Sequence, residues 1–69
     1  MLFLIEAKVI IRVPGISGPF EYVVTYLVNA LNLNIAKYKF EAQVRLDKQN
    51  HGLGNSFTFI YTKIASEIK

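Results

Sequence analysis

Apolar residues alternate with other residues along the first segment of the chain. From about Phe3 to Val13 every odd position is apolar, whereas the even positions mix apolar residues with charged ones such as Glu6 and Lys8. A period of two is typical of a strand with one buried face. The sequence therefore predicts a first strand here, which ends at the turn residues 14–19 because this stretch holds two prolines and two glycines.

The second segment, residues 20–31, is apolar at the spacing of a helix. Its apolar side chains recur three and four residues apart, and Pro19 suits a first helical turn. Asn32 and Asn34 then offer a stop at the carboxyl end. We predict a helix over residues 20–31, although its β-branched residues also permit a strand.

The third segment alternates without exception. Between Ala36 and Leu46 every even residue is apolar and every odd residue is polar or charged. As a helix, this pattern would distribute apolar residues around the whole circumference; as a strand, it buries one face and exposes the other. We predict a second strand over 36–46, a loop over 47–55 with two glycines, and a third strand over 56–62.

These elements predict a single α+β domain over residues 1–69 with the order β-α-β-β. A three-stranded antiparallel sheet would carry the helix on one face, and the last two strands would form a hairpin. We expect the third strand to lie between the first and the second; a parallel pairing of the first and second strands is the alternative. The helix would pack on six apolar residues: Val9, Ile11, Phe40, Val44, Phe57 and Phe59.

Composition narrows the biological setting. The 69 residues include no cysteine, so disulfides and thiolate metal sites are excluded. No apolar run is long enough to span a membrane, and Glu6 interrupts the opening apolar run before it reaches the length of a secretory signal. We expect a soluble, cytoplasmic protein whose small core is supplemented by a partner or by self-association.

Basic residues outnumber acidic residues by eight to five, for a net charge of +3. The predicted strands place most of the basic residues on the sheet face away from the helix, where they would contact nucleic-acid phosphates. The alternative is an ordinary solvated face, where lysine and arginine discourage aggregation. The candidate nucleic-acid-binding residues are Lys8, Arg12, Lys37, Lys39, Arg45 and Lys48.

A second candidate surface is apolar. Several large side chains fall where a single helix cannot cover them, and exposed apolar patches mark contacts between proteins. Tyr22 and Tyr26 lie one turn apart on the flank of the predicted helix and are either interface residues or partly buried ones. The candidate interface residues are Leu2, Leu4, Ile10, Tyr22, Tyr26, Ile60 and Ile64.

Groups suited to catalysis are few. His51 is the single histidine, with Asp47 four residues away as a possible orienting group, and the five carboxylates are dispersed along the chain. The alternating aromatic residues Phe57, Phe59 and Tyr61 are read as core contacts rather than as a stacking platform for bases. We therefore expect no enzymatic activity, no cofactor and no metal site.

The turn Val13-Pro-Gly-Ile-Ser17, followed by an amphipathic segment and a long hairpin, resembles the dodecins. That family has the order strand–helix–strand–strand, assembles into hollow shells and binds flavin. The flavin-stacking tryptophan of the family would fall near Tyr38 or Phe40, and its neighbouring glutamine near Thr58. This chain has no tryptophan, and it has threonine instead of glutamine at position 58. Both departures from the family argue against flavin binding.

The start of the chain, from Glu6 through Pro14, together with Ala30-Leu31-Asn32, is similar to the small dimerising subunit of the KEOPS tRNA-modification complex. That family has a second helix after its last strand, which the residues after Tyr61 are too few to supply.

The function predicted from the sequence is a non-catalytic module that self-associates or packs into a larger complex. Its small size, apolar excess and lack of catalytic groups support this interpretation. The alternative is a small basic protein, such as a ribonucleoprotein component, that binds RNA or DNA through the open sheet face.

Overall fold

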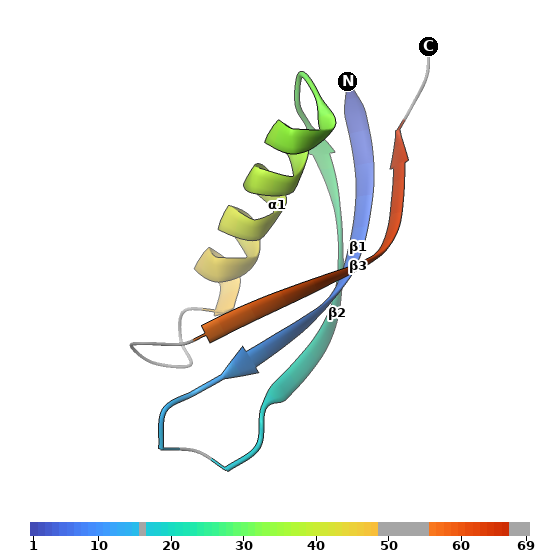
Figure 1. Ribbon diagram of the computed structural model, residues 1–69. Helices are drawn as coiled ribbons and strands as arrows, with labels where there is room; N and C mark the ends of the chain where they lie inside the picture. Colours follow the sequence, from blue (N-terminus) through green and yellow to red (C-terminus); the bar gives the residue numbers. More distant parts are fainter. Residues whose placement is uncertain (16, 49–55, 67–69) are drawn as a thin grey trace.

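Three strands and one helix make up the described part of the protein (Figure 1). The computed structural model describes residues 1–15, 17–48 and 56–66. The elements are, in chain order, β1 (Leu2–Arg12), β2 (Phe20–Asn29), α1 (Leu33–Lys48) and β3 (Ser56–Ser66). The predicted α+β class, with three antiparallel strands and a helix on one face, is confirmed.

The position of the helix along the chain differs from the prediction. The second strand occupies the segment expected to be helical, and the helix occupies the segment expected to be the second strand. The sheet order is β2-β1-β3, with β1 antiparallel to both neighbours. The expected central position of the last strand, the hairpin of the last two strands and the parallel alternative are therefore wrong.

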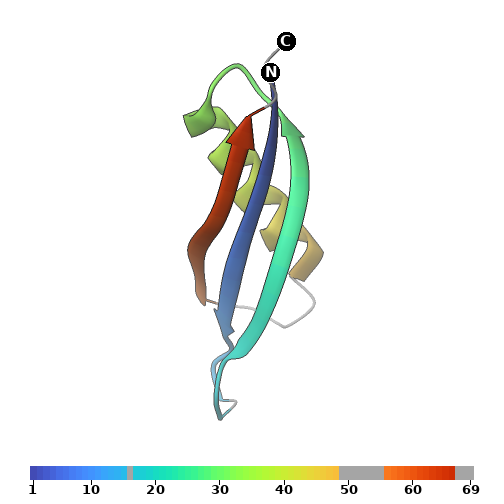
Figure 2. The same ribbon diagram turned by 90° about the vertical axis from the view of Figure 1, so that its right-hand side faces the viewer.

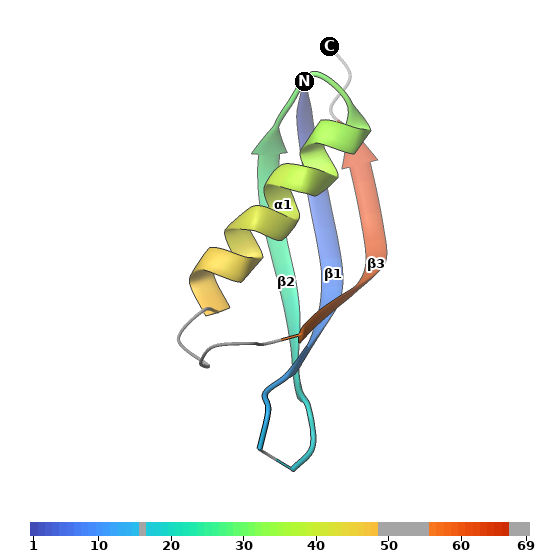
Figure 3. The ribbon, with the colours of Figure 1, turned by 60° about the vertical axis from the view of Figure 1, so that its left-hand side comes forward.

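Strand β2 forms because its residues favour an extended chain. Valine, threonine and tyrosine dominate it, and these residues pack well on a pleated surface. Gly15 and Gly18 take positive φ angles of 82° and 80°, which glycine adopts without strain, so the segment before Pro19 turns the chain back instead of starting a helix. The result is a long hairpin of β1 and β2 (Figure 3).

Helix α1 begins directly after Asn32, a residue that was predicted to end a helix. The Asn32 side chain accepts a hydrogen bond from the Ile35 amide at 3.0 Å, and the Ala36 amide donates to the Asn32 carbonyl at 3.0 Å. These are the contacts of an N-cap residue. Alanine, lysine, glutamate, glutamine and arginine, which have high helix propensity, together make up eight of the 16 residues of the helix that follows.

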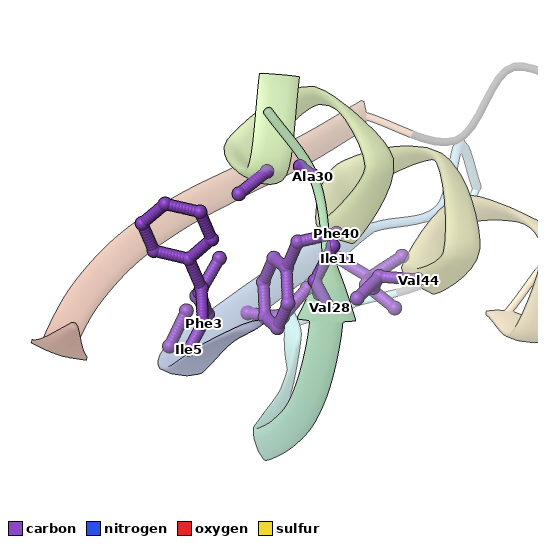
Figure 4. Packing of buried hydrophobic residues seen from close by; sticks show 10 residues of the cluster. Phe3, Ile5, Ile11, Val28, Ala30, Phe40 and Val44 are labelled. Carbon is purple, nitrogen blue, oxygen red and sulfur yellow. The ribbon is translucent and has the colours of Figure 1, made fainter. Parts of the chain in front are cut away.

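The core lies between α1 and one face of the sheet. The odd residues of β1 are at most 4% exposed, and Phe40 reaches from α1 toward them beside Val44 and Val28 (Figure 4). Phe57 and Phe59 of β3 pack against this cluster. The six residues predicted to form the core therefore do meet, although Phe40 and Val44 come from the helix side.

The outer surface of α1 retains apolar residues. Tyr38 is 75% exposed and Leu46 59% exposed, on the side of the helix away from Phe40. Alternate positions point to all sides of a helix, so the alternating apolar residues of this segment cannot all be buried by one sheet. A helix was rejected for this segment on that ground, and the exposed residues are the result. In the described part of the chain, no helix is long and apolar enough to cross a membrane.

Candidate functional site: the open face of the sheet

The sheet face opposite the helix is uncovered (Figure 2). It carries the even residues of β1 and the odd residues of β2, because directly paired residues of antiparallel strands point to the same side. We call this surface the open face. Its apolar members are Leu2, Leu4, Ile10, Val23, Leu27, Ile60 and Ala65.

Polar groups form a band across the middle of the open face. The Glu6 carboxylate accepts hydrogen bonds from the hydroxyls of Thr25 at 3.3 Å and Thr62 at 3.0 Å, one from each neighbouring strand. A β-bulge between Glu6 and Ala7 shifts the register of β3 and sets Lys63 directly opposite Glu6. The central acid is thus satisfied within the face.

Two apolar areas flank this polar band. On one side, Leu2, Leu4 and Leu27 line a shallow hollow with Ala65. On the other side lie Ile10, Val23 and Ile60, beside an ion pair of 2.8 Å between Lys8 and Glu21. Val23 is 71% and Leu27 66% exposed, which is a large exposure for apolar side chains in a strand.

The structure brings together four of the predicted interface residues. Leu2, Leu4, Ile10 and Ile60 share the open face, as predicted. Ile64 is paired with Ile5, whose side chain faces the helix, so it lies on the other side. Val23 and Leu27 were missed because they were assigned to the buried side of a helix; their alternation with Tyr22 and Tyr26 was the available signal.

Tyr22 and Tyr26 do not lie on a helix flank. Both belong to β2 and point to the helix-covered side, where they pack against the core. The Tyr26 ring meets Phe40 edge to face at 5.7 Å, and its hydroxyl donates to the Asp47 carboxylate. This hydrogen bond, with a smaller effect of burial, raises the pKa of Tyr26 to about 12. The reading of these tyrosines as partly buried residues is confirmed.

The predicted basic face does not form. Lys8 and Arg12 lie on the open face, but Lys37, Lys39 and Arg45 belong to α1 on the other side of the sheet. Lys48 ends that helix. The reason is the exchange of helix and strand: residues that would share one face of a strand are spread around a helix.

The helical basic residues are engaged in local contacts. The Lys37 ammonium lies 5.1 Å from the centre of the Tyr61 ring, and Arg45 lies 5.1 Å from that of Phe59. Lys39 instead reaches the other edge of the sheet and donates to the Asn29 carbonyl at 2.9 Å. Three cations therefore point in two directions rather than toward one phosphate backbone.

The aromatic residues of β3 are core contacts, as predicted. Phe57, Phe59 and Tyr61 are half-buried beneath α1, with the first two rings stacked at 6.2 Å. The Tyr61 hydroxyl donates to Glu41, and burial together with this hydrogen bond raises the pKa of Tyr61. Arg45 lies over the rings of Phe57 and Phe59, and Lys37 lies over that of Tyr61, so the three rings offer no free platform for bases.

Metal-binding and catalytic groups are sparse. Across residues 1–15, 17–48 and 56–66, no three histidine, cysteine, aspartate or glutamate residues gather as metal ligands. His51 lies outside the described residues, and Asp47 accepts hydrogen bonds from Tyr26 and from Gln43 at 3.0 Å. The open face is therefore the surface with the clearest functional character.

Comparisons with protein-family models, with curated proteins and with solved structures find no match to this chain. The dodecin resemblance rested on the order strand–helix–strand–strand, whereas the observed order is strand–strand–helix–strand. Both resemblances remain untested predictions.

Proposed function

We propose that the protein is a non-catalytic assembly module that self-associates through the open face of its sheet. The observation that carries this proposal is the combination of exposed apolar residues with internally paired charges on that face. Val23, Leu27 and Ile60 are 71%, 66% and 47% exposed. Removing such side chains from water is the main driving force of protein association.

The charges of the open face support a second copy of the chain as the partner. Lys8 is paired with Glu21, and Glu6 lies opposite Lys63, so the charges over most of the open face cancel. Two such faces can meet without net repulsion, and no partner of opposite charge is required.

The dimensions of the open face suit a small interface. Three strands of about ten residues span roughly 33 by 14 Å, or about 460 Å² in projection. Because side chains protrude from the sheet, the accessible area of the open face is larger than its projected area. It therefore approaches the roughly 800 Å² per partner that standard interfaces bury. Sheet-on-sheet stacking would bury it with side chains interdigitating.

The test is the mass of the protein in solution. We expect light scattering to give a mass above the 7.8 kDa of a single chain at micromolar concentration. Ile60→Glu places a charge in the contact and should lower this mass. Tyr38→Glu makes the same change at a 75% exposed residue on the opposite side of the molecule and should leave the mass unchanged. A wild-type protein that stays at the single-chain mass would refute the proposal.

A further inference from the structure

A groove lies between the outer edge of β2 and the helix. It has a volume of about 370 Å³ and is lined by residues 26–29 of β2 and by Lys39 and Gln43, which are one turn apart on α1. The carboxyl-terminal half of α1 extends past β2, so the helix covers the groove on one side (Figures 2 and 3). Small-molecule sites in proteins are clefts of about 300–1,000 Å³, and this groove falls at the lower end of that range.

The groove combines apolar surface with one cation. Tyr26, Leu27 and Val28 supply apolar atoms, and Lys39 supplies the charge. The Lys39 ammonium donates to the Asn29 carbonyl at 2.9 Å, and within residues 1–15, 17–48 and 56–66 it forms no ion pair. An ammonium group has three donors, and the described residues use only one of them. A cation beside an apolar wall is suited to an anionic group attached to an apolar body.

Backbone amides of β2 add further donors. The Ala30 amide donates to the Met1 carbonyl at 2.9 Å, and bonded and non-bonded pairs alternate along antiparallel strands. The amides of Leu27 and Asn29 therefore point away from β1, toward the outer edge. The bond from Lys39 to the Asn29 carbonyl agrees with this, because the amide and carbonyl groups of one residue point to the same side of a strand. Two amides and one ammonium thus stand along the same edge.

We propose that this groove binds a small monocarboxylate with an apolar body. The carboxylate accepts hydrogen bonds from the Lys39 ammonium and from the Leu27 and Asn29 amides, and such charge-assisted bonds are stronger than neutral ones. One cation with neutral amides balances a single negative charge, whereas a phosphate monoester would bring a charge of about −2. The proposal does not depend on self-association through the open face.

Asp47 sets the direction of the ligand. It lies eight residues after Lys39 on α1, about 12 Å along the helix axis. Its carboxylate accepts hydrogen bonds from the Tyr26 hydroxyl and from Gln43 at 3.0 Å. A bound carboxylate is therefore repelled from the Tyr26 end of the groove and attracted to the Lys39 end, which leaves the apolar body beside the Tyr26 ring.

Octanoate tests the groove, because it joins one carboxylate to an unbranched apolar chain. We expect saturable binding in a calorimetric titration, with the largest shifts of amide signals in NMR spectra at Leu27 and Asn29. 1-Octanol has the same chain without the charge. It should bind roughly tenfold more weakly, because the charge-assisted hydrogen bonds are lost.

Two lysine variants locate the site. Lys39→Gln removes the cation of the groove and should weaken octanoate binding roughly tenfold. Lys37→Gln is the matched control, because it removes the same charge from the same helix at a side chain that lies over the Tyr61 ring of β3, 5.1 Å from its centre. Its affinity for octanoate should equal that of the wild type, and circular dichroism checks that both variants are folded.

Three results would overturn the proposal: no saturable binding, equal effects of the two lysine variants, or amide shifts confined to open-face residues such as Ile10 and Ile60. If Lys39→Gln does not fold, the wild type still decides, because equal affinities for octanoate and 1-octanol would show that the carboxylate is not recognised. A wild type of single-chain mass that binds octanoate at Leu27 and Asn29 would refute the assembly proposal and support this one.

Discussion

Both faces of the sheet carry large apolar residues, but the helix covers only one of them. On the covered face the odd residues of β1 have lost nearly all contact with water, whereas on the open face Val23 and Leu27 remain more than half exposed. Both faces bear isoleucine and valine, and the open face bears leucine as well. A domain that needed only to fold would place polar residues on the second face, so the apolar excess there is better explained by contact with another surface than by stability of the single chain.

The substitution with the largest expected effect disrupts the packing between the helix and the covered face. Val44→Asp puts a charge where the valine is fully buried, and burying an unpaired charge costs several kcal/mol. Since small domains have only about 5–15 kcal/mol of stability, we expect no cooperative thermal transition. The neighbouring Gln43→Asp lies at an exposed position and should melt near the wild type. Equal loss in both variants would show that the helix is oriented differently.

Ile10 and Ile11 are adjacent on β1 and point to opposite faces of the sheet, so substitutions at these two positions compare the faces directly. Ile11→Ala should lower the free energy of unfolding by about 2–5 kcal/mol, because Ile11 is fully buried in the core. Ile10→Ala on the open face should cost well under half as much in dilute solution, and it should weaken self-association instead. Urea denaturation at low protein concentration separates these effects, and similar losses at both positions would contradict the assignment of faces.

Stability at alkaline pH tests the hydrogen bond between Tyr26 and Asp47 on the covered face. The unfolded chain releases a tyrosine proton near pH 10, whereas folded Tyr26 keeps its proton to about pH 12. Between these values the unfolded state binds fewer protons, so the free energy of unfolding should fall as pH rises. Tyr26→Phe should flatten this part of the profile in a series of urea melts. An unchanged slope would show that the bond to Asp47 does not hold in solution.

The smallest effect concerns nucleic acid. Lys37 lies toward β3 and Lys39 toward β2, so the two ammonium groups do not share a phosphate-binding surface. Lys37→Glu and Lys39→Glu together should change the binding of a short labelled RNA only slightly at low salt. A strong loss of affinity, with a salt slope reduced by about 2, would revive the nucleic-acid alternative.

The sequence was sufficient for the fold class and for the composition of the core. Phe40 and Val44 are four residues apart, and this spacing places two side chains on one side of either a strand or a helix. They were therefore assigned to the core correctly although their element was misidentified. The exposed Tyr38 and Leu46 distinguish the two readings, because in a strand they would have shared the buried face.

The segment from Phe20 to Asn29 could not be assigned from periodicity alone. Its apolar residues satisfy the spacing of a helix and, through Tyr22, Val24 and Tyr26, that of a strand. Local propensity favours the strand, and pairing along the whole length of β1 supplies the remaining stabilisation. Four open-face residues were predicted correctly because they belong to β1 and β3, which were recognised as strands. The basic face was predicted wrongly because it depended on reading the segment of α1 as a strand.

The central strand β1 precedes both of its neighbours in the chain: β2 follows it directly, and β3 comes after the helix. While the chain grows, β1 can pair with β2 early, but its other side waits for β3, more than forty residues after β1 ends. Closing a contact over so long a stretch slows folding and leaves an apolar strand unpaired in the meantime. The nascent hairpin of β1 and β2 is thus the stage at which the unpaired edge of β1 is most exposed to wrong partners.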